Sequence, residues 1–124
     1  VLLDFWFIRC GPCMSDMPST KLLHQAYEKL GFTVIGVHNK SESLDTVREF
    51  AEKNDIKYPI VVDTPEGVLL QQYAELGVFG FPTHILLGPD GKIIRNDTVN
   101  WDTGTLRELK LEFLHEAIHK GRSD

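Results

Sequence analysis

The chain has 124 residues, of which 42% are hydrophobic, and its formal net charge is -5 at pH 7. This length suits one domain with a hydrophobic core and is too short for two domains of ordinary size. The acidic residues are dispersed and there is no basic patch, which argues against nucleic acid and anionic membranes as partners. We therefore expect one domain over residues 1–124. Because the chain begins within a strand-like run, we also expect it to be N-terminally truncated or excised from a longer protein.

The first half of the chain predicts a strand, a helix and a second strand. Residues 1–8 form an apolar run typical of a buried strand, and a helix is expected from Met14 onward, with Pro18 inside it and Gly31 at its end. Five residues are expected to form its inward stripe: Leu22, Leu23, Ala26, Tyr27 and Leu30. Residues 32–37 are β-branched and apolar, which favours a second strand parallel to the first.

The second half predicts an inserted helix, a hairpin and a final helix. Residues 43–54 are amphipathic around Leu44, Val47 and Ala51, and residues 58–62 indicate a short strand. A short helix follows, with Leu69, Tyr73 and Leu76 spaced for one face and Gly77 ending it. Residues 83–87 and 92–99 flank a Gly-Pro-Asp-Gly turn, which predicts an antiparallel hairpin. A capping box at residues 105–108 opens the final helix.

Both cysteines of the chain lie in one Cys10-Gly11-Pro12-Cys13 motif, directly after the first strand. We expect Cys10 at the exposed start of the helix, where backbone N–H groups and the helix dipole favour a thiolate. Cys13 follows one turn later and is expected to point toward the interior. The spacing therefore predicts a nucleophilic and a resolving thiol. A zinc site lacks a second cysteine pair, and His115 and His119 have no further ligands in the pattern, so no metal is expected.

The motifs together resemble the thioredoxin-like superfamily. Asp4-Phe5-Trp6 precedes the cysteine motif, and Gly80-Phe81-Pro82-Thr83 follows far downstream. The inserted helix and the run through Asp90-Gly91 are most similar to the TlpA/ResA branch, which is related to the peroxiredoxin-like domains. The resemblance implies an α/β, thioredoxin-like fold: a central mixed β-sheet flanked by helices, with an extra helix between the second and third strands.

The same resemblance implies a thiol-disulfide oxidoreductase that reduces protein disulfides, with no cofactor beyond the Cys10-Cys13 disulfide. The Gly-Pro dipeptide resembles that of reducing thioredoxins. The implied partners are a disulfide-containing protein substrate and an upstream redox protein that donates electrons. The resemblance also implies that the protein is a monomer and works outside the cytoplasm, either in the periplasm or tethered to a membrane. The sequence shows no targeting signal, so a cytoplasmic location stays open.

Asp4 is a carboxyl group in the middle of an apolar strand. An unpaired buried charge is costly, so the side chain is expected to take up and return a proton. Resemblance to thioredoxins assigns that proton to the second cysteine. The alternative is that Asp4 faces solvent at the end of its strand. Replacement by Asn separates the two interpretations.

Substrate contacts are expected from residues on both sides of the cysteine motif. By resemblance, Pro82 is the cis-proline that faces the cysteines, which leaves the backbone of Phe81 free to pair with an extended substrate. Phe81 is bulky for this position and either docks substrate or packs against Trp6. Arg9 either favours the Cys10 thiolate or is an ordinary surface residue. The full predicted contact set is Trp6, Arg9, Gly11, Pro12, Phe81, Pro82 and Thr83.

Two other functions stay open at this stage. One is a peroxiredoxin-like thiol peroxidase, although neither the Pro nor the Thr that precedes a peroxidatic cysteine in that family precedes Cys10. The other is a non-catalytic interaction module of a larger protein, against which the intact cysteine motif counts. A peroxidase would consume hydroperoxide with a thiol donor, and in an interaction module the cysteine pair would stay unreactive to thiol reagents. A disulfide reductase would do neither.

Overall fold

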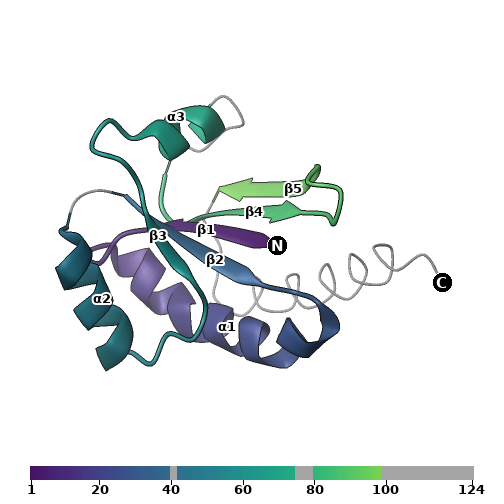
Figure 1. Ribbon diagram of the computed structural model, residues 1–124, viewed down its shortest axis with the longest axis horizontal. Helices are drawn as coiled ribbons and strands as arrows, with labels where there is room; N and C mark the ends of the chain where they lie inside the picture. Colours follow the sequence, from purple (N-terminus) through teal and green to yellow (C-terminus); the bar gives the residue numbers. More distant parts are fainter. Residues whose placement is uncertain (40–41, 75–79, 99–124) are drawn as a thin grey trace.

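The computed structural model describes residues 1–39, 42–74 and 80–98, which build one five-stranded sheet flanked by helices (Figure 1). In chain order the elements are β1 (Leu2–Trp6), α1 (Gly11–Tyr27), the 3-10 turn η1 (Glu28–Leu30), β2 (Val34–His38), α2 (Leu44–Lys53), β3 (Ile60–Val62), α3 (Val68–Ala74), β4 (Thr83–Leu87) and β5 (Ile93–Thr98). The predicted α/β class and the helix inserted between the second and third strands are both confirmed.

The sheet has the order β3-β2-β1-β4-β5, with β1 at its centre. β1 is parallel to β2 and antiparallel to β4, while β2 is parallel to β3 and β4 is antiparallel to β5. All five residues of β1 are buried. A strand that is covered on both faces has a nearly continuous apolar sequence. This is why the apolar run at residues 1–8 predicted β1 well.

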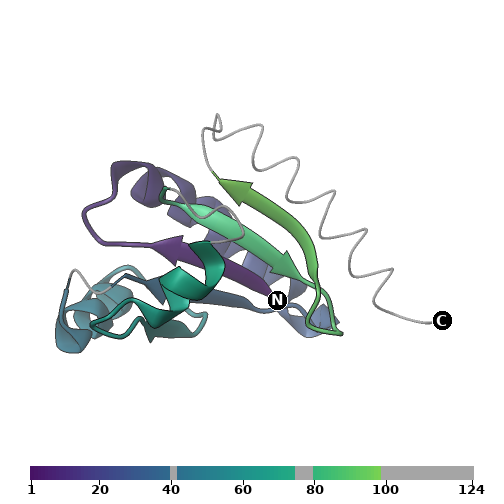
Figure 2. The same cartoon turned by 90° about the horizontal axis from the view of Figure 1, so that it is seen from above.

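Side chains alternate between the two faces of the sheet. α1 and α2 lie on one side of the sheet and α3 on the other, as the two views show (Figures 1 and 2). Leu3 and Phe5 pack with Val37 and Ile85 on the α3 side. Asp4 and Trp6 are offset by one residue and so face α1. The end of β1 therefore delivers an acid and an indole to the helix that carries the cysteines.

The buried face of α1 is the largest departure from the sequence analysis. Leu22 is 49% exposed and Leu30 42% exposed, and Ala26 is exposed as well, so the predicted apolar stripe is wrong except at Leu23 and the half-buried Tyr27. The buried residues of α1 are Cys13, Asp16, Met17, Ser19, Thr20, Leu23 and His24. Most of these are polar, and a stripe chosen on apolar residues alone cannot find a helix face whose polar groups bind one another inside the fold.

The other boundaries fall close to the predicted ones. α1 begins at Gly11, continues through Pro18 and is followed by η1, whose C-cap Gly31 has φ +87°, a conformation that suits glycine. Ser43 caps α2 by accepting the Thr46 N–H, and Val47 is buried whereas Leu44 is 56% exposed. β2 and β3 start two residues later than predicted. The end of the third helix and the whole predicted final helix lie outside the described residues. Within the part of the chain that the structure describes, no helix is both long and apolar enough to cross a membrane.

His38, at the end of β2, couples stability to pH. Its side chain is fully buried, lies edge-on to Trp6 and has Nδ1 at hydrogen-bond distance from the Asn39 carbonyl. Burial lowers the pKa of His38 below its usual value of 6.5, against smaller opposing effects of the Asn39 carbonyl and Glu42. The unfolded chain therefore binds this proton more readily than the folded one, and stability is lost as the pH falls through about 6.5.

Protonation of this histidine in the unfolded chain should lower the free energy of unfolding by at most about 1.4 kcal/mol between about pH 7.5 and about pH 5.5. His38→Gln, which cannot take up the proton, should flatten that part of the stability profile. Urea unfolding followed at several pH values measures it. Equal losses in the variant and the wild type would assign the acid sensitivity to other groups.

Candidate functional site

Cys10 and Cys13 form a disulfide at the N-terminus of α1, with their Cα atoms 5.1 Å apart. Cys10 is the N-cap of the helix, and its sulfur accepts a hydrogen bond from the Cys13 backbone N–H at 3.2 Å. The same N–H and the positive end of the helix dipole stabilise negative charge on Cys10 once the disulfide opens. This geometry makes Cys10 the sulfur whose thiolate the helix favours.

The predicted difference in exposure between the two cysteines is wrong for this oxidised state. Cys10 is 4% exposed and Cys13 is 3% exposed. Both belong to one buried cluster with Trp6, Met17 and Val47. Partly buried residues complete that cluster, among them Phe7, Ile8, Met14 and Phe81. In this oxidised state, therefore, little of either cysteine is open to solvent.

Of the predicted substrate contacts, three are buried. Trp6 is 1% exposed and packs against His38 and Phe50, with ring centroids 4.9 Å and 5.6 Å away. Pro82 and Thr83 are also fully buried. In this oxidised state these three residues lie in the interior beneath the site and do not form its surface. The surface beside the disulfide is left to Gly11 and Pro12, which are exposed, together with Arg9 and Phe81.

The Phe81–Pro82 peptide bond is cis, as the resemblance implied. Phe81 is partly exposed and stands edge-to-face against Phe7, with ring centroids 5.4 Å apart. It touches both the cysteine cluster and the core on the α3 side of the sheet. Thr83 donates its hydroxyl to the Gly80 carbonyl at 2.5 Å, which ties the loop together. Phe81 therefore packs inward against the cysteine cluster, and part of its ring stays exposed, so its docking of substrate stays a prediction.

Arg9 points into solvent next to the motif. Its side chain is 86% exposed and pairs with Glu42 at 3.5 Å. An exposed ion pair is screened by water and salt, so it contributes little to the charge balance at a buried sulfur. The interpretation of Arg9 as an ordinary surface residue is therefore the better supported one. The sequence did not indicate its partner, Glu42, which lies in the loop between β2 and α2.

Asp4 is buried, at 5% exposure, so the alternative of a solvent-facing strand end is wrong. Its Oδ1 lies 3.3 Å from Nε2 of His84, and Oδ2 of Asp16 lies 2.9 Å from the same nitrogen. Thr20 donates its hydroxyl to Asp16 Oδ2 at 3.3 Å. The single acid predicted from sequence is therefore one member of a buried polar cluster formed by Asp4, Asp16 and His84.

Sequence reasoning missed Asp16 and His84. Asp16 could have been found from its spacing, because it follows Cys13 by three residues and so shares its helix face. His84 could have been found from strand alternation, because it is the register partner of Asp4 in the β1–β4 ladder. The three side chains also offer ligand atoms within 4.8 Å of one another, a donor set that a divalent cation can use.

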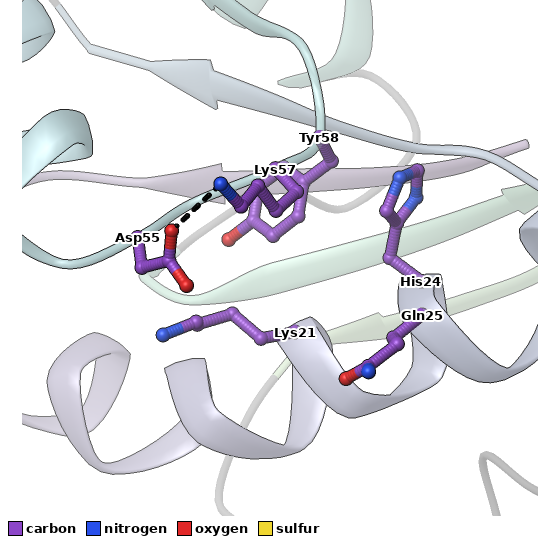
Figure 3. A pocket seen from close by; sticks show the side chains of 6 residues that line it. All are labelled: Lys21, His24, Gln25, Asp55, Lys57 and Tyr58. Atoms are coloured by element: carbon purple, nitrogen blue, oxygen red, sulfur yellow. Dashed lines mark ion pairs between the residues drawn. The ribbon is translucent and has the colours of Figure 1, made fainter.

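A pocket of about 210 Å³ opens between α1 and the segment that leads into β3 (Figure 3). Its lining residues are Lys21, His24, Gln25, Asp55, Lys57 and Tyr58. Both lysines already have partners, since Lys21 donates to the Asn54 carbonyl at 2.6 Å and Lys57 pairs with Asp55 at 2.8 Å. Burial, and then the charges of Asp4 and Asp16, raise the pKa of Tyr58, so its phenol stays neutral. None of the predicted site residues lines this pocket.

Comparison with known proteins agrees with this geometry. A family model described as Redoxin matches residues 1–110. The thiol-disulfide oxidoreductase ResA of Halalkalibacterium halodurans is 33% identical over 118 residues, covering 95% of this chain and 61% of that protein. The Arabidopsis thaliana protein SUPPRESSOR OF QUENCHING 1, chloroplastic, is 35% identical over 98 residues, covering 76% of this chain and 9% of that protein.

Solved structures show the same fold. The solution structure of a thiol:disulfide interchange protein from Bacteroides sp. superposes with a TM-score of 0.73 at 26% identity, covering 92% of this chain and 72% of that one. The predicted thioredoxin-like fold is therefore confirmed. The chain spans about half the length of several ResA proteins that it matches, for example 52% of ResA from Bacillus cereus.

Proposed function

The chain belongs to the redoxin family and carries the Cys-x-x-Cys centre of a ResA-like thiol-disulfide oxidoreductase, and we propose that it reduces protein disulfides. The observation that carries the proposal is the disulfide at the N-cap of α1, where the Cys13 N–H points at the Cys10 sulfur. That arrangement distinguishes the two sulfurs chemically although both are buried.

In the proposed cycle, the Cys10 thiolate attacks a substrate disulfide, forming a Cys10–substrate bond and releasing one substrate thiolate. Cys13 loses its proton, attacks Cys10 and closes the Cys10–Cys13 disulfide while the second substrate thiolate leaves. Two electrons pass from the dithiol to the substrate, whose two thiolates take up protons. A dithiol redox protein then returns the centre to its reduced form.

The surface beside the disulfide supports an extended protein segment as substrate. Gly11 and Pro12 are exposed, and Phe81 presents a partly exposed ring. An extended chain can pair with the backbone next to Pro82 in the manner of strand addition, while Phe81 contacts its apolar side chains. Pro82 and Thr83, which are buried, hold this loop in place.

We place this activity in a monomeric domain formed by residues 1–124, working outside the cytoplasm. The support is resemblance to the TlpA/ResA branch, whose members receive electrons from a membrane donor. The reducing direction is supported by the Gly-Pro dipeptide between the cysteines, which is similar to that of reducing thioredoxins. The redox-active disulfide is the only cofactor that the proposed cycle requires.

The test is reduction of insulin disulfides with dithiothreitol as the electron source. We expect the domain to accelerate insulin precipitation and to leave added hydroperoxide unconsumed under the same conditions. Equilibration with glutathione buffers then gives the direction: a strongly oxidising potential would contradict the reductase assignment. Peroxide consumption without insulin reduction would favour the peroxidase alternative, and a disulfide that stays inert to thiols in the folded protein would favour the interaction module.

A further inference from the structure

We propose that His84 is a positioning residue for the resolving step, holding Asp4 and Asp16 as one unit that accepts the proton of Cys13. This inference rests on the proposed function, because it concerns the step in which Cys13 attacks Cys10. One nitrogen, His84 Nε2, lies 2.9 Å from Asp16 Oδ2 and 3.3 Å from Asp4 Oδ1.

The three residues come from three different elements. Asp4 is on the central strand β1, His84 is its register partner on β4, and Asp16 is on α1 above them. All three are 5% exposed. Such convergence fixes the imidazole between the two carboxylates, because each side chain is held by a different part of the fold.

Asp16 places the unit on the same face of α1 as Cys13. Cys13, Asp16 and Thr20 occupy positions i, i+3 and i+7 of α1 and are all buried, so they form one stripe that faces the sheet. On β1, Asp4 lies two residues from Trp6, which packs in the same cluster as both cysteines. A proton leaving Cys13 therefore meets this unit on the inner side of the helix.

Charge explains why the histidine is needed. Two carboxylates that share a buried site cannot both ionise easily, because each negative charge disfavours the other. His84 Nε2 lies near an oxygen of each carboxylate, and an imidazole so placed holds the two acids together and, when protonated, offsets their repulsion. Among the residues whose side chains the structure describes, Asp4 from β1 and Asp16 from α1 face His84, and both carboxylates raise the pKa of Tyr58. On β5 the register partner of His84 is Asp97.

In the step itself, the Cys13 S–H bond breaks and its proton moves to a carboxylate oxygen of the unit. The Cys13 thiolate then bonds to Cys10, the Cys10–substrate bond breaks and the substrate thiolate leaves. The proton returns to Cys13 when the electron donor later opens the Cys10–Cys13 disulfide. His84 keeps its place between the acids throughout, and no additional oxidant or reductant is required.

The experiment uses an aromatic disulfide that releases a coloured thiolate. Mixing it with the reduced protein gives a first release when Cys10 attacks and a second release when Cys13 resolves the adduct. Stopped-flow absorbance at a series of pH values yields the pH at which the second release reaches half of its maximal rate. A chelator is present throughout, since the donor set could also hold a cation.

His84→Gln keeps an amide donor at this position but removes the positive charge. We expect it to raise the half-maximal pH of the second release by about one unit, and so to slow that release about tenfold at lower pH. Asp16→Asn removes the neighbouring negative charge and is expected to move the half-maximal pH in the opposite direction. Combining Asp4→Asn with Asp16→Asn should slow the second release about a hundredfold, and more than either change alone.

Asp45→Asn is the matched control, because it removes one carboxylate that is 94% exposed on α2. It should leave both releases unchanged. A His84→Gln profile that coincides with the wild type, or shifts of equal sign in His84→Gln and Asp16→Asn, would overturn the positioning role. A second release in the wild type that changes when the chelator is left out would assign the cluster to a metal instead. A wild type without a second release would contradict the proposed function itself.

Discussion

Replacing Cys13 with serine is expected to stop the cycle at a covalent adduct between Cys10 and its substrate. Serine cannot attack the mixed disulfide, so Cys13→Ser should retain one round of substrate binding and lose turnover by at least about a thousandfold. Mass spectrometry of the protein after incubation with a disulfide substrate measures the adduct, and the insulin assay measures the turnover. In cells, the same variant would retain the physiological substrate for identification.

Cys10→Ser is the matched variant, since it leaves Cys13 as the only thiol. We expect neither an adduct nor turnover from it. Exposure does not decide between the sulfurs, because Cys10 and Cys13 are 4% and 3% exposed. The assignment depends instead on the helix N-cap and on the Cys13 N–H that points at Cys10. Adducts that form on Cys13 of Cys10→Ser, and not on Cys10 of Cys13→Ser, would reverse the roles of the two cysteines.

Local patterns predicted the frame of the site. The buried run of β1, the cysteine motif after it and the turn of the β4–β5 hairpin are each encoded within a few consecutive residues. Alternation along each strand decides which side chains share a face, whereas the mixed sheet was implied by the resemblance and is confirmed. Resemblance added the cis bond before Pro82, which no local pattern of this sequence implies.

The polar interior was not predictable in the same way. Asp16, Thr20 and His24 lie on the buried face of α1, whereas Leu22 is 49% exposed. A hydropathy scale assigns such residues to the surface, because it gives the free energy of burying each polar side chain without a hydrogen-bond partner. Inside the fold that cost is offset by partners such as His84, which is 68 residues away in sequence from Asp16. Long-range pairs of this kind appear only when the sheet is assembled.

Gly36→Ala is the substitution from which we expect the largest loss of stability. Gly36 lies on β2 opposite Asp4, and the absence of a side chain makes room for two aromatic rings. A Cβ atom there would lie 2.9 Å from Trp6 Nε1, 3.3 Å from Tyr58 Cε2 and 3.5 Å from Ile60 Cγ1. Trp6 and Tyr58 are both buried and packed, so neither ring can move away without disturbing its neighbours.

Two effects compete in this variant. Replacing glycine with alanine within a strand or helix favours folding by about 0.5–1 kcal/mol through backbone entropy. Overpacking of a filled core costs about 1–3 kcal/mol, and a contact of 2.9 Å with a buried indole belongs at the upper end of that range. We expect the clash to prevail and the free energy of unfolding to fall by about 1–2 kcal/mol. Urea unfolding of the oxidised protein measures it.

Gly11→Ala provides the control for an added methyl group, because nothing lies within 4 Å of the Cβ position there. Because Gly11 is the first residue of α1, the free energy of unfolding of this variant should equal that of the wild type or rise by up to about 1 kcal/mol through backbone entropy. Since Trp6 packs against both cysteines, a displaced indole in Gly36→Ala should also change the rate at which dithiothreitol opens the disulfide. An alanine variant as stable as the wild type would mean that β2 or the indole shifts freely. The cysteine site would then depend less on the packing around Trp6 than its burial implies.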